Sequence, residues 1–339
     1  MAYELAGRLV VGVASSALFD LTDSDRVFRE DGEDAYRSHQ ERHLDVTLAP
    51  GVAFPFVKRL LSLNNLGTED DPLVEVIVLS RNDPDTGLRV MRSIRAHKLP
   101  ISRAIFKQGR APYSFMPVLN MSLFLSANEE DVREAVATGL PAGRVLGPMP
   151  QDDEDDTDLR IAFDFDGVLA SDRAEQVYQR EGIEKFRDYE VAHADVPHDA
   201  GPLRDFLAGI NRIQQREEDR RRTDPGYRLR VSVSIVTARN SPADERAVKS
   251  LKRWGVRVND AFFLGGIDKG RIMEVLRPHI FFDDQRVHLD STARTTPSVH
   301  IPIGQINEPA QINEPAQINE PAPVSEPART SEPANALVE

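Results

Sequence analysis

The sequence predicts an α/β protein made of two doubly wound parallel-sheet halves related by an internal duplication. Three observations support this expectation. Short β-branched apolar runs alternate with amphipathic stretches, as in parallel sheets that helices cover on both faces. The first half of the chain recurs in the second at a nearly constant spacing. A proline-rich repeat ends the chain and is too poor in apolar residues to join either half.

The strands of both halves are expected where apolar runs of strand length occur. These runs are residues 9–14, 74–80, 161–165, 231–236 and 280–282. Between two of them, ERAVKSLKRWG (residues 245–255) has apolar residues at helical spacing and ends on glycine, which predicts an amphipathic helix with a glycine stop.

The internal similarity keeps one offset over a long stretch. DRVFREDGEDAYRSH from Asp25 matches EQVYQREGIEKFRDY from Glu175, an offset of 150 that pairs Gly32 with Gly182. Further along, VEVIVLS matches VSVSIVT at an offset of 157 and pairs Ser80 with Thr237. Because one frame shift relates so many matches, we expect a duplicated fold.

Composition shifts divide the chain into four parts. We expect a first half over residues 1–146, an acidic linker over 147–158, and a second half over 159–304 that contains a cap insertion at about 172–229. Residues 305–339 (QINEPAQINEPA and its continuation) are expected to be a disordered tail, since proline removes backbone donors and favours extended conformations. The tail is either a solvated appendage or a docking peptide.

Charge and composition limit the classes of function. The net charge is −13 and the pI is about 5.2, so the chain lacks the basic surplus of a general nucleic-acid or anionic-membrane binder. It has no cysteine, which excludes disulfides and thiolate metal sites and fits a cytoplasmic protein. No apolar run is long enough for a membrane helix. We therefore expect a cytoplasmic protein without nucleic-acid or membrane partners, and homo-oligomer formation stays open.

Polar residues of the second half follow the predicted strands. In open α/β sheets, ligands bind outside the carboxyl ends of the strands, so these side chains are expected at one edge. They are Asp164, Asp166, Thr237, Lys269, Asp283 and Asp284.

This set of residue types suits phosphoryl transfer. Asp164 would attack phosphorus, and Asp166 would act as general acid and then as base. Gly167 would let the backbone turn closely around the phosphate. Thr237 and Lys269 would hold the non-bridging oxygens.

The carboxylates also predict a metal site. Magnesium prefers oxygen ligands and is usually held by one or two carboxylates together with phosphate oxygens. Asp164 would supply one ligand, and Asp283 and Asp284 would complete the site. We therefore expect Mg²⁺ as the cofactor.

The order DxDGV, a strand-ending threonine, a lysine and then DD resembles the haloacid dehalogenase-like phosphatases. The resemblance covers most of residues 159–290 and implies a Rossmann-like fold with a cap. It also implies an aspartyl-phosphate intermediate on Asp164, with Asp166 as acid and base. The metal would be held by Asp164, the Asp166 carbonyl and Asp283, with Asp284 assisting.

Longer strings resemble the cytosolic 5′-nucleotidase I family. They include LAPGVAFPFVKRLLSLN, VLSRNDPDTGLRVMRSI and FLGGIDKGRIMEVLRPHIFFDDQ. The resemblance implies Mg²⁺-dependent hydrolysis of nucleoside 5′-monophosphates, AMP among them. The chain reads FDFDGV where family members read closer to FDGDAV, a departure that keeps both aspartates and changes the pocket beside Phe165.

The first half lacks the acids. Ala14 and Ser16 stand opposite Asp164 and Asp166, and Ser126-Ala127 stands opposite the later aspartate pair. This half is therefore either a packing partner or a source of nucleotide contacts.

If the first half contributes contacts, Arg81, Asn82 and Asp83 are the expected substrate-binding residues. Arg239 of the second half is a further candidate. The alternatives to a 5′-nucleotidase are a phosphatase for another small phosphate ester and a non-catalytic nucleotide-binding or scaffold protein.

Overall fold

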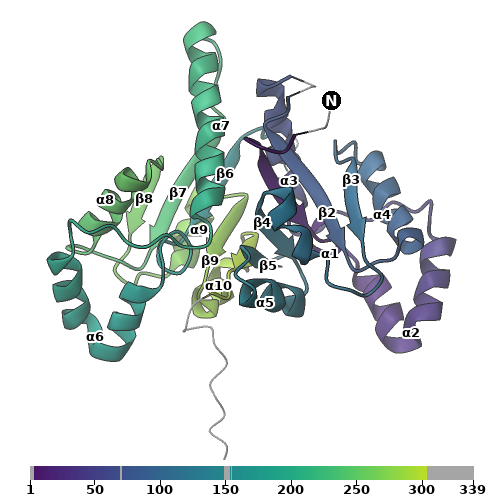
Figure 1. Ribbon diagram of the computed structural model, residues 1–339, viewed down its shortest axis with the longest axis horizontal. Helices are drawn as coiled ribbons and strands as arrows, with labels where there is room; N and C mark the ends of the chain where they lie inside the picture. Colours follow the sequence, from purple (N-terminus) through teal and green to yellow (C-terminus); the bar gives the residue numbers. More distant parts are fainter. Residues whose placement is uncertain (1–3, 69–70, 149–152, 154, 304–339) are drawn as a thin grey trace, which may run out of the picture. The chain divides into compact units, whose positions relative to one another are not determined.

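A computed structural model describes residues 4–68, 71–148, 153 and 155–303. These residues build one ten-stranded sheet in the order β3-β2-β1-β4-β5-β10-β9-β6-β7-β8, covered by helices (Figure 1). The α/β class is as predicted. The expected tail at 305–339 lies outside the described residues.

The strands lie close to the predicted runs. They are β1 (Leu9–Val13), β2 (Val74–Ser80), β3 (Arg103–Phe106), β4 (Met121–Ser126), β5 (Ala142–Leu146), β6 (Leu159–Phe163), β7 (Val231–Thr237), β8 (Asp260–Phe263), β9 (Ile280–Asp283) and β10 (Ser298–His300). β1 and β2 are buried along their whole length, because helices cover both faces of a parallel sheet.

The α-helices alternate with these strands. They are α1 (Ser15–Leu18), α2 (Thr22–Arg42), α3 (Phe54–Ser62), α4 (Pro84–Ala96), α5 (Glu129–Ala137), α6 (Arg173–Ala192), α7 (Arg204–Thr223), α8 (Asp244–Trp254), α9 (Lys269–Leu276) and α10 (Arg286–Thr292). The predicted helix at 245–255 is confirmed as α8, and Gly255 ends it with a left-handed φ of 70°. Short 3₁₀ turns are η1 (Leu63–Leu66), η2 (Tyr113–Phe115) and η3 (Pro117–Leu119).

The two halves share one sheet. Each contributes parallel strands in the same relative order, β3-β2-β1-β4-β5 in the first and β8-β7-β6-β9-β10 in the second. The only antiparallel pairing among the described strands is β5 with β10, at the centre. The sequence predicted two parallel-sheet halves but not that these two central strands join them edge to edge.

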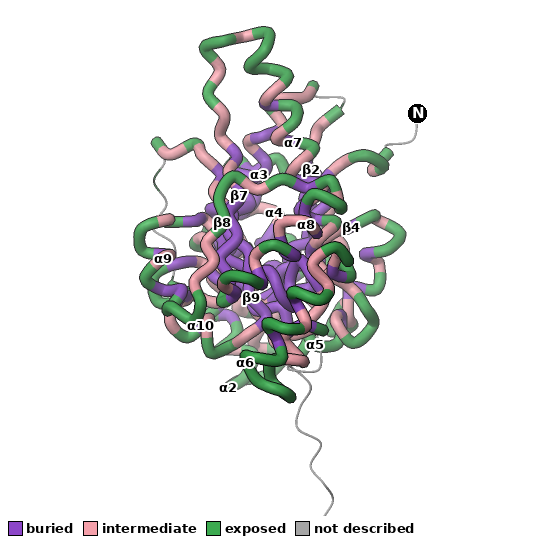
Figure 2. Tube along the Cα trace, turned by 90° about the vertical axis from the view of Figure 1, so that its left-hand side faces the viewer, coloured by how far each residue is buried: buried purple, intermediate pink, exposed green. Residues whose placement is uncertain are grey.

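α2 and α6 have the same shape. Each is interrupted by a glycine with a left-handed φ, Gly32 at 84° and Gly182 at 85°, a conformation that glycine adopts without strain. Figure 1 shows the two helices at opposite ends of the sheet, and Figure 2 shows that both are largely exposed while the strands are buried.

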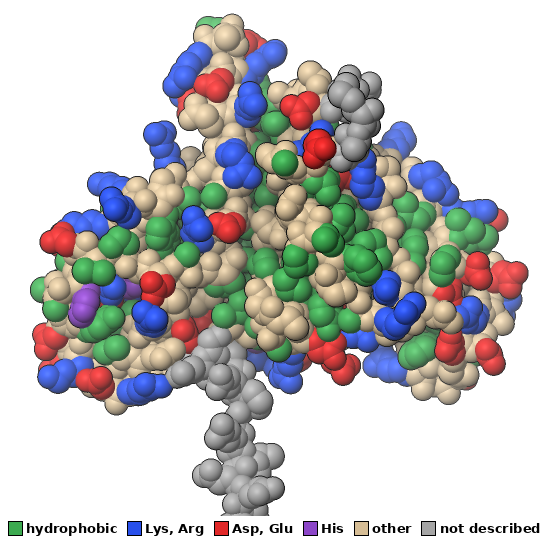
Figure 3. Space-filling model, in the orientation of Figure 1, with side chains coloured by type: hydrophobic (Ala, Val, Ile, Leu, Met, Phe, Trp, Pro, Cys, Tyr) green, Lys and Arg blue, Asp and Glu red, His purple; other side chains and the backbone are tan. Residues whose placement is uncertain are grey.

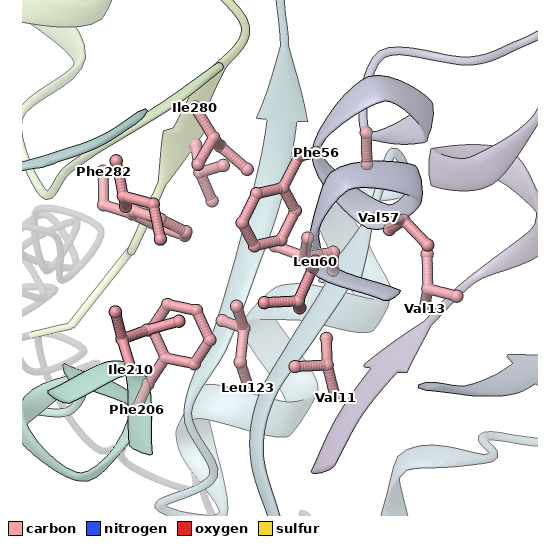
Figure 4. Packing of buried hydrophobic residues seen from close by; sticks show 14 of the residues in the cluster. Val11, Val13, Phe56, Val57, Leu60, Leu123, Phe206, Ile210, Ile280 and Phe282 are labelled. Carbon is pink, nitrogen blue, oxygen red and sulfur yellow. The ribbon is translucent and has the colours of Figure 1, made fainter. Parts of the chain in front are cut away.

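One hydrophobic core runs through both halves on one face of the sheet. Phe56 and Leu60 of α3 lie opposite Phe206 and Ile210 of α7, and all four are buried (Figure 4). Phe206 contacts Phe56, Phe163 and Phe282 with ring centroids 6.4, 6.2 and 5.9 Å apart. On the opposite face each half has its own smaller core.

The expected cap at 172–229 stays a prediction. Its second helix, α7, buries Phe206, Leu207 and Ile210 in the main core, so α7 is part of the fold rather than a cover. The mostly exposed α6 is the part of this segment that could cover a site.

The described residues of the acidic stretch 147–158 are exposed or half-buried. Asp156 is half-buried and accepts from Arg160 Nη2 at 2.8 Å. β5 ends and β6 begins on either side of this stretch.

Phe206→Ala should strongly destabilise the protein. Removing a buried ring that packs between the halves leaves a cavity, and such losses cost about 3–5 kcal/mol. Denaturant unfolding of the full chain measures this cost. Val275→Ala, which is 85% exposed on α9, is the matched control and should change stability by less than about 0.5 kcal/mol. Equal effects of the two substitutions would contradict the shared core.

Candidate active site

The predicted site residues of the second half lie at the carboxyl ends of neighbouring parallel strands. Asp164 and Asp166 follow β6, Thr237 ends β7, and Asp283 ends β9. These strands are adjacent in the sheet, so their ends meet at one edge. Lys269 is the first residue of α9, and Asp268 caps this helix by accepting from the Gly270 backbone N–H at 2.9 Å. All six predicted catalytic and metal residues are buried.

Lys269 lies between two aspartates. Its Nζ donates to Asp283 Oδ2 at 2.7 Å and lies 3.1 Å from Asp164 Oδ1. Burial disfavours the ammonium, but the attraction of Asp164 and Asp283 outweighs it and raises the pKa of Lys269 above its ordinary value. Lys269 is therefore the cation that holds the carboxylate cluster together.

One lysine does not balance the cluster. Among the described residues, both carboxylate oxygens of Asp284 are buried without a hydrogen bond, and the buried Asp164 Oδ1 shares Lys269 with Asp283. Burial raises the pKa of Asp164 to about 6 even though Lys269 opposes it, and burial together with the Asp283 charge raises the pKa of Asp284 well above its ordinary value. Buried, unpartnered carboxylate oxygens are the donors that a hard divalent cation prefers. The residues present therefore fit a metal ion.

Sequence reasoning missed His288. Its Nδ1 lies 3.2 and 3.3 Å from the two carboxylate oxygens of Asp283. Asp164, Asp283 and His288 each offer one ligand atom, and these atoms lie within 4.8 Å of one another. The only hint in the sequence is a histidine five residues after a candidate ligand, which the structure places in the first turn of α10.

Asp166 is held by Arg239. The guanidinium donates to both carboxylate oxygens, at 2.6 and 2.7 Å, and lies over the rings of Phe165 and Phe186 at 5.1 and 5.4 Å. Arg239 is only 4% exposed. A bidentate pair of this kind fixes both the position and the orientation of a carboxylate.

Glu190 of α6 extends this pair into a buried network. It accepts from Arg239 and, at 2.8 Å, from Arg246 Nη1 of α8, and His198 Nε2 lies 3.3 Å from the carboxylate oxygen that Arg239 contacts. Sequence reasoning missed Glu190, Arg246 and His198. Comparing the halves at the offset of 150 pairs Glu190 with the uncharged Gln40. This difference in charge could have pointed to Glu190.

Gly167 and Thr237 complete the edge. Gly167 has a φ of 70°, and a Cβ at this position would lie 2.2 Å from Asp284 Oδ2, so only glycine fits between Asp284 and the turn. The Thr237 hydroxyl accepts from the Arg239 backbone N–H at 3.3 Å.

Comparison with known proteins shows the family of the chain. The sequence pattern of the 5′-nucleotidase family matches residues 1–308. The chain belongs to the 5′-nucleotidase family. It is 31% identical over 293 residues to human cytosolic 5′-nucleotidase 1B, a match that covers 84% of this chain and 47% of the human protein. The chain thus spans about half the length of the curated relative that it matches.

No solved structure matches the chain. Among the described residues, none of the helices has both the length and the apolar character needed to cross a membrane.

The first-half residues expected to bind substrate lie in a different place in this 5′-nucleotidase-family chain. Arg81, Asn82 and Asp83 follow β2 and line a cavity of about 910 Å³ in the first half. β2 is six strand steps from β6, or about 29 Å at the usual spacing. This is too far for one nucleoside monophosphate to contact both these residues and Asp164, so the expectation that they contact a substrate held at Asp164 is not supported.

Glu190→Gln tests the buried network through its pH dependence. Burial raises the pKa of Glu190, but the adjacent His198 and Arg239 outweigh it and lower the pKa to about 2 from an ordinary 4.5. Ionised Glu190 therefore stabilises the fold above about pH 4.5, and this contribution is lost as the pH falls towards 2.

The free energy of unfolding of Glu190→Gln should lie about 3 kcal/mol below wild type at pH 7. The gap should narrow at pH 3.5, as measured by denaturant unfolding. Glu184→Gln, at an exposed position on the same helix, is the matched control. A gap that stays constant or widens on acidification would contradict the ionised network.

Proposed function

We propose that this chain is a Mg²⁺-dependent 5′-nucleotidase that hydrolyses nucleoside 5′-monophosphates through an aspartyl-phosphate on Asp164. The observation that carries the proposal is the buried cluster of Asp164, Asp283 and Asp284 at one sheet edge, in which one lysine is shared by Asp164 and Asp283 and the Asp284 oxygens have no hydrogen bond among the described residues. Membership of the 5′-nucleotidase family supports the substrate class.

The metal would be held by Asp164, Asp283 and Asp284 together with the backbone carbonyl of Asp166. His288 would orient Asp283 or join the ligands, as its 3.2 Å contact suggests. A bound magnesium ion would supply the positive charge that brings a phosphate dianion and the attacking carboxylate together.

The chain's own groups would carry the two chemical steps. An oxygen of Asp164 forms a bond to phosphorus while the bond from phosphorus to the ester oxygen breaks, and Asp166 gives a proton to the departing 5′-oxygen. Asp166 then takes a proton from water as the water oxygen attacks phosphorus. The bond to Asp164 breaks and phosphate leaves. Thr237, Lys269 and the backbone at Gly167 would hold the non-bridging oxygens.

Arg239 would act mainly on Asp166. Because its guanidinium is buried and donates to Asp166 and Glu190, we assign it the positioning of the acid and base instead of the direct substrate contact expected from the sequence. One of the two hydrogen bonds to Asp166 would be given up when Asp166 carries its proton.

Duplication would explain how one half came to lack these groups. The equal strand order of the halves and the glycine interruptions of α2 and α6 support it. In this proposal residues 1–146 form the degenerate haloacid dehalogenase-like half and 159–304 the catalytic one. Residues 147–158 join them, and 305–339 form a tail.

The substrate and surroundings of the protein follow from its relative and its surface. The name of the human relative, cytosolic 5′-nucleotidase 1B, supports a nucleotide substrate and a cytoplasmic location. Figure 3 shows acidic and basic side chains interspersed on the face it presents, in keeping with a small-molecule partner.

Asp164→Asn should abolish the activity. The wild type should release phosphate from AMP with Mg²⁺ and lose this activity in EDTA, and the variant should be slower by about a thousandfold or more because the nucleophile is gone. Phosphate release from a panel of nucleotides and sugar phosphates measures this. Asp188→Asn, exposed on α6, is the control. Release that survives Asp164→Asn would overturn the mechanism, and release only from non-nucleotide esters would favour another phosphatase.

Arg239→Lys separates positioning from substrate binding. Lysine keeps the charge but cannot donate to both oxygens of Asp166 in the same planar geometry, so kcat for AMP should fall about tenfold to a hundredfold while KM changes less than about threefold. Steady-state kinetics measures both constants. Arg253→Lys, exposed on α8, is the control. A rise in KM with kcat unchanged would instead make Arg239 a substrate contact.

A further inference from the structure

The first half contains the large cavity of about 910 Å³ at the place where the second half has its carboxylates. Ala14, Ser15 and Ser16 line it, and they stand opposite Asp164, Phe165 and Asp166 at the offset of 150. This volume lies within the range of small-molecule sites.

The second half has bulkier groups at the positions that correspond to this cavity wall. There, the Arg239 guanidinium lies between Phe165 and Phe186. The first half has Ser15 in place of Phe165 and Asn82 in place of Arg239, and Tyr36 in place of Phe186 donates to Asn82 Oδ1 at 3.1 Å. Tyr36, Asn82 and the charged side chains beside them form the polar wall of the cavity. Hydrogen bonds within this wall hold it in place, and the space that it encloses stays open.

Two arginines of this wall pair with carboxylates of the same wall. Arg37 pairs with Asp83 at 2.5 Å and with Glu33 at 3.0 Å, and Arg81 pairs with Asp131 at 2.5 Å. A phosphate dianion would have to compete with these carboxylates for Arg37 and Arg81. The aspartates that would hold a metal in the second half are absent here. Both points favour an uncharged ligand that is bound without a metal.

Phe28 and Asn82 are suited to bind a ligand that has a flat heterocycle and hydroxyl groups. Phe28 is 51% exposed and is held edge-on by Tyr36, with ring centroids 5.7 Å apart at 85°, so its face can stack on a heterocycle. The Asn82 side-chain nitrogen makes no hydrogen bond within the described residues and can donate to one. The exposed carboxylate of Asp25, which also lines the cavity, can accept from ligand hydroxyls.

We propose that this cavity is a metal-independent binding site for a nucleoside. The identity of the nucleoside as the reaction product rests on the proposed function, but its chemistry rests on the wall alone. The site is separate from the carboxylate cluster, since β1 and β6 are five strand steps apart, or about 24 Å. Arg81, Asn82 and Asp83 belong to this second site.

Adenosine titrated calorimetrically into the full chain in EDTA tests the site. One equivalent should bind, with the same affinity in Asp164→Asn. Phe28→Ala should weaken binding about tenfold or more through loss of stacking. Tyr178→Ala is the matched control, because Tyr178 takes the equivalent place in the second half and is similarly exposed, at 43%; it should change affinity less than about twofold. Asn82→Leu provides a second variant should Phe28→Ala fail to fold.

Several results would overturn the proposal. They are absence of adenosine binding in EDTA, loss of binding in Asp164→Asn, a larger effect of Tyr178→Ala than of Phe28→Ala, and displacement of adenosine by inorganic phosphate. The two proposals fail separately. Adenosine binding without phosphate release from AMP would support the cavity site and contradict the proposed enzymatic function. Phosphate release from AMP without adenosine binding in EDTA would support the enzymatic function and contradict the cavity site.

Discussion

The contact of Lys269 with Asp164 and Asp283 is the interaction on which the second half depends. Several carboxylates are buried at one sheet edge, and without a cation their mutual repulsion and desolvation would oppose folding. Lys269 reaches them because α9 begins there, with Asp268 as its cap. It nevertheless leaves the oxygens of Asp284 unpartnered. The half is thus folded around buried oxygens of a kind that suits a divalent cation.

The first half shows that this arrangement is not a requirement of the fold. It has the same strand order and the same glycine interruption in its long helix. The Asp166–Arg239–Glu190 set is replaced there by Ser16, Asn82 and Gln40, while Arg89 still stands opposite Arg246 and donates to Gln40 at 3.2 Å. The charged groups differ as a set between the halves, whereas the strand order is the same. Groups that vary as a set in this way serve chemistry more than stability.

Residues at strand ends could be placed from the sequence, whereas contacts that depend on helix paths could not. Asp164 and Asp283 were expected side by side because parallel strands bring their carboxyl ends to one edge. The Arg239–Glu190 contact could not be predicted, since it depends on where α6 runs after the break at Gly182. The joining of β5 to β10 was missed because neither strand has a long apolar run, so their pairing depends on tertiary packing.

The shared core explains how the chain tolerates its buried charges. Unpartnered carboxylates in the second half cost stability, and a separate domain of that size would have to offset the cost from its own core. Here α3 and α7 pack against each other across the halves, with Phe56 against Phe206, so apolar burial in the first half also supports the second. The half without the acids therefore contributes to stability through this shared core. The packing of α3 against α7 provides this stability. The strand ends of the first half, which lie elsewhere, can therefore line a cavity without weakening the shared core.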